Sequence, residues 1–548
     1  AVAVLGTDAE KNPRVELIRA AAEITRGYES RRSPDDRIVV RFKPGVDEIL
    51  VPLLFDAVGR TIRKVGDYLG YHPQPPVIVE VLPGAEALSR MTGLGTSAIE
   101  TSGTIAICKY GRLMVTSPRV TLKGYGWLDT ASHELVHMII AQKTLNRTPI
   151  WLHEALARYL DTLWRSDEPL YRKGLSPRSE NLLARAVEKS ELITFDQMHP
   201  SMALLPSQEA AELAFAEVYM AADFTERRFG RKAAAKILDG IRNGLDDSAA
   251  LKAVTGMARD GFVRAWMSWM KRLKLRKLEG DPLLKDSRTR DERLSAERRL
   301  GSKRNLGIRD HLHLGELLRA RGRTRAAVVE YTRAVDLAGP RHAAIWLVAD
   351  KLGKALLELG KPGRAKKVFS KSLEVNPEDL EANLHVGLLL LEDDPYEGWL
   401  YLRRCERINP LDPRVQGALV SACKKLIERG DEHEPWKAHL ERHERALEIL
   451  RRQRARTVGG PSEKPPAEGT RPPLGTASLR INTMPWASVW LDGRDTGLTT
   501  PVFELSVSPG RHVLRLQADC TPGPVEIELN LRAGERKLIE RRLCDQAE

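Results

Sequence analysis

Residues 133–137, His-Glu-Leu-Val-His, have the types and the spacing of a metal-dependent hydrolytic site. Residues four apart lie on the same face of a helix, so His133 and His137 can point at one ion. Zn²⁺ lowers the pKa of a bound water to about 7, and a neighbouring carboxylate can take its proton. The spacing therefore predicts His133 and His137 as zinc ligands and Glu134 as the general base. The alternative is an amphipathic helix that carries two histidines by chance.

A catalytic zinc site needs a third protein ligand, and the segment after the motif offers one. Pro149 suits the first turn of a second helix, and the short polar connector 144–148 favours an antiparallel pair of helices. The second helix carries Glu154 and, next to it, His153. Adjacent positions on a helix diverge by about 100°, so at most one of these two side chains can face the ion.

The two helices resemble those of the gluzincin metallopeptidases, the thermolysin-like superfamily, and most closely the bacterial peptidase MA-like family. There, the His-Glu-x-x-His helix is followed by a helix that opens Pro-x-Trp-Leu, as residues 149–152 do here, and that carries the glutamate ligand. Residues 155–157, Ala-Leu-Ala, fit the family pattern except for Ala155, where Gly is commoner. His153 is a departure. The resemblance implies Glu154 as the third ligand of a zinc peptidase.

The resemblance also implies an edge strand that pairs with an extended peptide substrate. Residues 105–108 and 112–118 are typical of a β-hairpin that turns at Tyr110-Gly111. We expect residues 112–116 to be the substrate-binding edge strand. An ordinary buried strand is the alternative.

The oxyanion of the tetrahedral intermediate needs a donor besides zinc, and gluzincins commonly use a Tyr or His after the third ligand. The pattern from Glu209 to Phe229 predicts a helix that contains Tyr219, our candidate for this donor. A buried aromatic that only packs its own helix is the alternative, and Tyr159 and His153 are weaker candidates.

The remaining elements must position these residues. Residues 37–42 and 77–82 read as strands, and residues 46–69 have helical periodicity. We expect an α+β zinc peptidase domain at 35–275, after an N-terminal helical segment at 1–34. Asp129 is a candidate for orienting the imidazoles, since ligands need such partners.

The chain is basic, and much of its charge lies after this domain. Of the formal net charge of +13, residues 271–305 contribute +7, from 13 Lys/Arg against 6 Asp/Glu. Acids are interspersed and aromatic residues are missing there, so we expect a solvated helical connector at 276–308 rather than a nucleic-acid site.

Glycines then recur at the spacing of a helical repeat. Gly315, Gly353 and Gly387 each follow an apolar residue. The pattern resembles tetratricopeptide repeats, in which small residues let two helices pack closely and an aromatic fills the seam. We expect an α-helical solenoid at 309–456 with a capping helix near 434–456, serving either as a protein-binding groove or as a rigid spacer. The residues that repeat are Gly322 and Gly360, Ala327 and Ala365, and Tyr331 and Phe369; the irregular third unit has Gly398, Leu402 and Cys405.

A Pro/Gly-rich linker at 457–475 leads to residues 476–548, which alternate as strands with turn signals. Met484-Pro485, residues 487–493 and residues 509–512 resemble the PEGA domain, a small all-β sandwich of bacterial envelope proteins. The resemblance implies contact with a cell surface or wall.

The five cysteines bear on the compartment. Cys520 and Cys544 both fall in the β region, and a disulfide between them would imply an oxidising compartment. Cys405 and Cys423 are expected to be free and buried. No run of 18 apolar residues predicts a membrane span. The chain starts at Ala1 without Met, so we expect a removed signal peptide and a periplasmic, cell-surface or secreted protein.

Together these features predict a multidomain zinc metallopeptidase that hydrolyses peptide bonds. Two alternatives stay open: a non-catalytic scaffold that keeps zinc for structure, and a hydrolase of peptidoglycan cross-links. A closed site with a fourth protein ligand would favour the scaffold.

Overall fold

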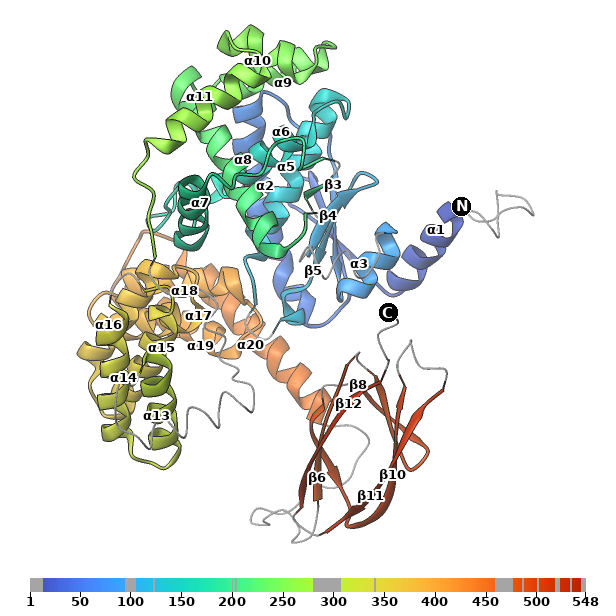
Figure 1. The fold of residues 1–548 in the computed structure, drawn as a ribbon, viewed down its shortest axis with the longest axis vertical. Helices are drawn as coiled ribbons and strands as arrows, with labels where there is room; N and C mark the ends of the chain where they lie inside the picture. Colours follow the sequence, from blue (N-terminus) through green and yellow to red (C-terminus); the bar gives the residue numbers. More distant parts are fainter. Residues whose placement is uncertain are drawn as a thin grey trace. The chain divides into compact units, whose positions relative to one another are not determined.

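The computed structural model of the chain describes two units, Ala1–Val458 and Gly459–Glu548, and each is considered by itself (Figure 1). Within these, no helix of the described residues is long and apolar enough to cross a membrane. The described residues are 13–93, 105–121, 124–199, 201–202, 205–278, 307–339, 342–458, 477–484, 487–499, 502–517, 523–532 and 535–543.

The first unit contains a five-stranded mixed sheet in the order β1-β2-β3-β5-β4. β2, β3 and β5 are parallel, and β1 and β4 pair antiparallel at the two edges. The predicted strands and the hairpin at Tyr110-Gly111 are confirmed. The strands are β1 (Glu29–Arg32), β2 (Ile38–Phe42), β3 (Val77–Leu82), β4 (Ala106–Lys109) and β5 (Arg112–Thr116).

One strand prediction is wrong. Residues 112–116 form β5, which pairs with β3 on one side and with β4 on the other. The edge strand is therefore β4. The chain reaches the outer position first and then turns back through Tyr110-Gly111 to fill the place beside β3.

The helices of this part carry the site against the sheet. α2 has apolar residues on one face and ends at Gly70, whose φ of 67° is a left-handed C-cap. The helix predicted at 209–229 is confirmed as α8, and Gly230 is its C-cap residue. The helices are α1 (Pro13–Ile24), α2 (Leu50–Leu69), α3 (Ala85–Thr92), α5 (Trp127–Thr144), α6 (Ile150–Leu160), α7 (Pro177–Lys189), α8 (Gln208–Phe229), α9 (Ala233–Arg242), α10 (Asp247–Thr255) and α11 (Arg259–Lys271), with the 3₁₀ turns η3 (Val46–Ile49), η4 (Pro118–Val120) and η5 (Leu163–Arg165).

α5 and α6 form the predicted antiparallel pair. α5 ends at Leu145, which has φ of 55°, and Pro149 caps the start of α6 in an extended conformation. Trp151 in the first turn of α6 stacks on Phe195 with ring centroids 4.3 Å apart, and Phe195 in turn packs on Trp266. Aromatic packing of this kind fixes α6 along the protein core.

Helical hairpins follow, as the glycine spacing predicts. A Cβ added at Gly315 would lie 2.4 Å from the ring of Tyr331, and one at Gly353 would lie 2.4 Å from that of Phe369. Only glycine allows these helices to approach so closely. The helices are α13 (Ile308–Ala320), α14 (Thr324–Ala338), α15 (Ile345–Glu358), α16 (Pro362–Val375), α17 (Leu380–Leu390), α18 (Pro395–Ile408), α19 (Pro413–Glu428) and α20 (Trp436–Val458).

α18 joins these hairpins to the α+β part of the same unit. The carboxylate of Glu168 accepts from Arg407 at 2.5 Å and from Arg403 at 3.5 Å. The backbone N–H of Tyr125, just before α5, donates to the carbonyl of Ile408 at 3.0 Å. The repeats are therefore packed against the start of the helix that carries His133.

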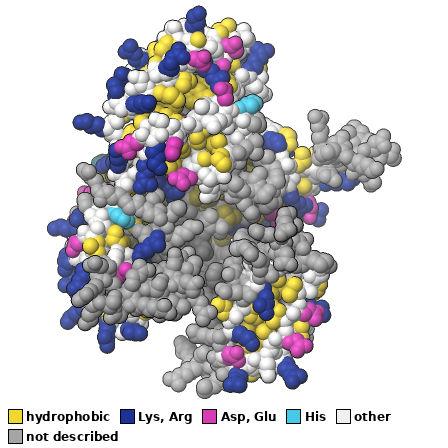
Figure 2. Space-filling view, in the orientation of Figure 1, with side chains coloured by type: hydrophobic (Ala, Val, Ile, Leu, Met, Phe, Trp, Pro, Cys, Tyr) yellow, Lys and Arg dark blue, Asp and Glu magenta, His cyan; other side chains and the backbone are white. Residues whose placement is uncertain are grey.

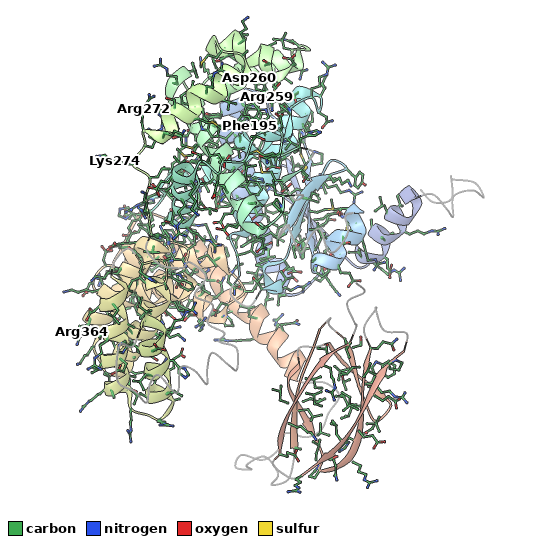
Figure 3. All side chains as sticks on the ribbon, viewed as in Figure 1. Phe195, Arg259, Asp260, Arg272, Lys274 and Arg364 are labelled. Atoms are coloured by element: carbon green, nitrogen blue, oxygen red, sulfur yellow. The ribbon has the colours of Figure 1, made fainter. Side chains whose placement is uncertain are left out.

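Charged side chains cover the surface in view. Figure 2 shows Lys and Arg spread over the face of the first unit, with Asp and Glu among them. Arg364 of α16, for example, points away from the helical hairpins (Figure 3). The predicted connector at 276–308 lies mostly outside the described residues.

The second unit is all-β in its described residues. Two sheets, β11-β10-β7-β8 and β12-β6-β9, share one apolar core. Cys520 and Cys544 lie outside the described residues, so their pairing stays a prediction, whereas Cys405 and Cys423 of the first unit are buried free thiols. The strands are β6 (Ala477–Met484), β7 (Ser488–Leu491), β8 (Arg494–Thr499), β9 (Val502–Val507), β10 (Gly510–Gln517), β11 (Val525–Leu531) and β12 (Arg536–Arg542).

Candidate metal centre

The α5–α6 pair brings three potential ligands together. The Nε2 atoms of His133 and His137 are 3.1 Å apart, and each lies 3.4 Å from Oε2 of Glu154. Among the described residues, these three form the one group of at least three His, Cys, Asp or Glu side chains close enough to hold a metal ion.

The donor triangle fits zinc. Bonds of 2.0–2.1 Å in a tetrahedral site place neighbouring ligand atoms about 3.3 Å apart, which the three distances match. Oε2 of Glu154 is buried and has no hydrogen-bond partner. A buried carboxylate oxygen without a partner is costly, and a cation in the triangle would satisfy it. The three side chains are 15–17 % exposed, so the centre is not fully shielded from solvent.

The electrostatics of the centre also favour a cation. Burial disfavours charge on His133. Even so, its contacts with Asp161 and Glu154, together with the charges of Glu154 and Glu134, raise its pKa to about 10. The carboxylates therefore create a potential that can stabilise a positive charge at this place.

Nδ1 of each imidazole lies near a side chain that the sequence analysis did not predict as its partner. Nδ1 of His137 lies 2.5 Å from Nδ1 of His153, whose pKa burial lowers to about 3. A neutral His153 can accept the Nδ1–H of His137 and leave Nε2 free for a metal. Nδ1 of His133 lies 3.7 Å from Oδ2 of Asp161. The spacing of Asp161 from Glu154 could have indicated this role, because two helical turns place both residues on the same face.

Asp129 does not orient either imidazole. Its carboxylate accepts from Nε and Nη2 of Arg165 at 2.9 and 2.7 Å and from Nε1 of Trp164 at 2.9 Å. The prediction for Asp129 was wrong because this residue lies one turn before the motif and faces the η5 segment instead.

Glu134 points from α5 toward the edge strand. Its Oε2 accepts the backbone N–H of Cys108, in β4, at 2.9 Å. Burial raises the pKa of this carboxyl, against the opposing effect of the two histidines. A carboxylate with a raised pKa beside a metal position is suited to proton transfer.

α8, which carries Tyr219, packs against α6. Phe215, one turn earlier, packs edge-on to His133 with ring centroids 6.4 Å apart. Tyr219 is 7 % exposed, its ring lies 5.3 Å from that of Tyr159, and burial raises the pKa of its hydroxyl. The hydroxyl of Tyr159 is directed to Asp223 at 3.4 Å.

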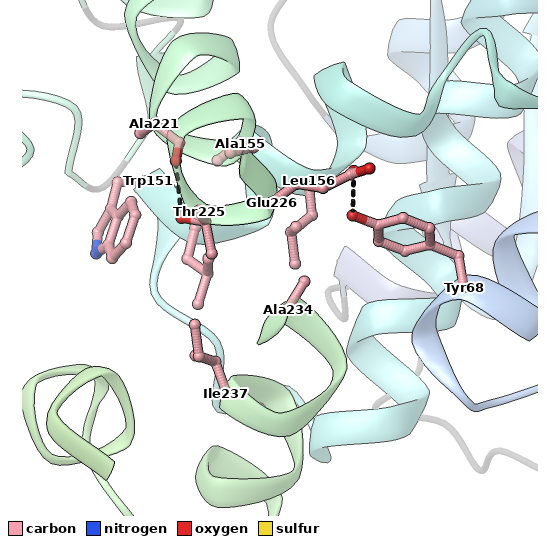
Figure 4. A pocket seen from close by; sticks show the side chains of 11 residues that line it. Tyr68, Trp151, Ala155, Leu156, Ala221, Thr225, Glu226, Ala234 and Ile237 are labelled. Carbon is pink, nitrogen blue, oxygen red and sulfur yellow. Dashed lines mark hydrogen bonds between the residues drawn. The ribbon is translucent and has the colours of Figure 1, made fainter. Parts of the chain in front are cut away.

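A small cavity lies among α2, α6, α8 and α9, and Trp151, Ala155 and Leu156 of α6 line it (Figure 4). Its volume of about 10 Å³ is at the lower limit for one water molecule, and its wall is mostly apolar. The hydroxyl of Tyr68 donates to Glu226 at 2.7 Å beside it. This cavity is a packing gap and not a substrate site.

Residues 61–272 match the model of the Peptidase MA superfamily. This stretch contains the three donors, Glu134 and Tyr219. The prediction of a peptidase MA-like domain is thereby confirmed at the level of the superfamily. No curated protein matches the sequence.

Solved structures with related folds give only distant likenesses. Native yeast LTA4 hydrolase is 11 % identical, with 77 % of this chain and 66 % of that chain covered and a TM-score of 0.30. MamA is 14 % identical over 31 % of this chain and 91 % of its own, with a TM-score of 0.24. YrrB, described as a TPR protein with an unusual peptide-binding site, is 14 % identical over 29 % and 97 %, with a TM-score of 0.20.

Proposed function

We propose that the chain is a zinc metallopeptidase whose ligands are His133, His137 and Glu154. The observation that carries the proposal is the donor triangle with 3.1–3.4 Å edges around the unpartnered Oε2 of Glu154. Three protein ligands with an accessible fourth position are typical of catalytic zinc, whereas structural sites are closed by four. Among the described residues no fourth protein donor completes the group, which argues against the scaffold.

The roles of the chain's own residues follow from their places. Zinc, when bound, activates a water and polarises the scissile carbonyl. Glu134 would accept the proton of the attacking water and return it to the leaving amine. His153 and Asp161 keep the imidazoles oriented. Tyr219 is our candidate for the oxyanion donor.

The substrate would lie along β4. This strand is the edge of the sheet, and an extended peptide can add to such an edge through main-chain hydrogen bonds. Glu134 bonds to the N–H of Cys108 within this strand. A peptide on β4 would therefore pass directly in front of the general base.

Glu134→Gln tests the proposal. Glutamine keeps the shape of the side chain and leaves all three ligands in place, so zinc content should stay at about one ion per chain. Loss of general-base catalysis should lower the hydrolysis of a broad peptide library by roughly 10²–10⁴-fold. Equal cleavage by the wild type and the variant would show that the hydrolysis does not occur at this site. A zinc-loaded wild type that cleaves no peptide would favour the scaffold or a peptidoglycan hydrolase.

We further propose that the protein works in the bacterial envelope or outside the cell. The support is the resemblance of residues 476–548 to a PEGA domain and the cysteines at 520 and 544. Non-reducing peptide mapping of protein made in an oxidising compartment should find the Cys520–Cys544 disulfide. Two free thiols would contradict the disulfide and remove this support for an oxidising compartment.

A further inference from the structure

α6 divides its residues between two faces. Trp151 and Ala155, among others, line the small cavity in the core (Figure 4). Glu154 and Arg158, four residues further on, are not among the residues that line it. Residues four apart share one side of a helix. Arg158 is therefore the next side chain along the face of α6 that carries the proposed third ligand.

The contacts of Arg158 place it beside His133. Its Nη1 donates to Oδ2 of Asp161 at 2.9 Å, and the same Oδ2 lies 3.7 Å from Nδ1 of His133. The guanidinium of Arg158 therefore lies, through Asp161, on the His133 side of the metal centre.

Most of this guanidinium is unused. A guanidinium has five N–H donors in a planar fork. In the described part of the chain, Asp161 is the one residue that hydrogen-bonds to Arg158, whose side chain is 47 % exposed. Arg165 makes a useful contrast. Its Nε and Nη2 both bond to Asp129, and its side chain is only 11 % exposed.

We propose that Arg158 binds a carboxylate of the substrate on the His133 side of the metal centre. The carboxylate is either the C-terminus of a peptide or the side chain of an Asp or Glu close to the scissile bond. Arginine is the preferred partner for such groups because its fork can pair with both oxygens. The inference rests on the proposed peptidase function and adds a substrate class to it.

The test uses zinc-loaded Glu134→Gln protein, which should bind peptides without cleaving them. Three fluorescent peptides of one sequence are compared by anisotropy: a free C-terminal acid without acidic side chains, its C-terminal amide, and that amide with one Gln replaced by Glu. A carboxylate peptide should bind about 10–100-fold more tightly than the neutral amide, as expected for a hydrogen bond to a charged group. The first and third peptides distinguish the two sources of carboxylate.

Variants assign the preference to Arg158. Arg158→Gln should abolish the difference between carboxylate and amide peptides, and Arg158→Lys should keep part of it. Arg264→Gln, at an exposed arginine of α11, is the control and should change nothing. Zinc content is measured for each variant.

Three outcomes would overturn the inference. Equal binding of all peptides by the parent protein would contradict it while leaving the peptidase proposal intact, provided that wild type still hydrolyses peptides. A fall in zinc content in Arg158→Gln would show that Arg158 only holds Asp161 in place. Absence of both binding and hydrolysis would remove the peptidase proposal and this inference together.

Discussion

Glu154 on α6 and Glu217 on α8 make an instructive pair. In each, Oε2 is buried and has no hydrogen-bond partner. Burial works against the charge of Glu154, but the charge of His137 and the contacts with both imidazoles lower its pKa well below the usual range. Burial raises the pKa of Glu217 to about 8, with only the N–H of Ile193 opposing the rise.

The difference lies in what surrounds each carboxylate. Glu154 lies beside two imidazole nitrogens at 3.4 Å, so it is held as an anion among metal donors. Glu217 has one backbone donor and otherwise a low-dielectric environment, so it is held as a neutral acid. An unpartnered buried carboxylate oxygen therefore indicates a metal site only where other ligands converge on it.

Removing a histidine ligand should have the largest effect, because it takes away a group that holds Glu154 as an anion. His133→Ala or His137→Ala deletes one of three ligands, so the zinc content should fall from about one ion per chain to near zero. Metal analysis after dialysis measures this. His199→Ala, at an exposed histidine of the same domain, should keep the metal. Full zinc retention in His133→Ala would show that the ion binds elsewhere.

Glu217→Gln tests whether Glu217 is held as a neutral acid. The folded-state pKa of about 8 lies above the ordinary 4.5, so the stability linked to this proton is fully present below about pH 4.5 and is lost as the pH rises through 8. The variant cannot ionise and keeps an acceptor for Ile193. It should be more stable than wild type at pH 8, by roughly 2–5 kcal/mol.

Denaturant unfolding at pH 4.5 and pH 8, with a chelator present, measures this difference. The gap between Glu217→Gln and wild type should close near pH 4.5. Glu209→Gln on the exposed first turn of α8 is the control, with an expected change under about 0.5 kcal/mol. A pH-independent gap would show that Glu217 does not titrate as described.

Asp161→Asn should weaken zinc binding without abolishing it. Partners of ligating histidines typically contribute 10–100-fold in metal affinity. Competition with a chromophoric chelator should detect a change of about that size. Asp129→Asn is the informative companion, because Asp129 bonds to Trp164 and Arg165 and should affect stability but not zinc affinity. Equal losses of affinity in both variants would contradict the assignment of Asp161.

The smallest effect concerns the seam between α15 and α16, where an aromatic ring packs on a glycine. A Cβ at Gly353 would lie 2.4 Å from the ring of Phe369, so Gly353→Ala should cost about 1–3 kcal/mol of stability. Gly363→Ala adds the same methyl on α16, where nothing lies within 4 Å, and should cost nothing. Urea unfolding of the two variants measures the difference. Equal stabilities would mean that the repeat helices can move apart freely.

Much of this arrangement could be predicted from the sequence because it depends on local spacing. His133 and His137 are four apart, and the glycines of the hairpins recur with the aromatic that fills each seam. The edge strand could not be predicted, because alternation identifies a strand but does not determine its place in the sheet. Asp161 was missed because it lies at the end of α6, outside any motif. Asp129 was misassigned because its partner, Arg165, comes from a turn that no pattern predicted.

The contact between α18 and the α+β part limits how far this chain can be truncated. Glu168 is 11 % exposed and bonds to Arg403 and Arg407. Tyr125, two residues before α5, gives its N–H to Ile408. A fragment that stops before the hairpins would leave this carboxylate and this N–H without their partners, at a cost of about 1–3 kcal/mol for each group that stays buried. Such a fragment would be less stable than the intact unit, so the shortest fragment worth expressing keeps α18.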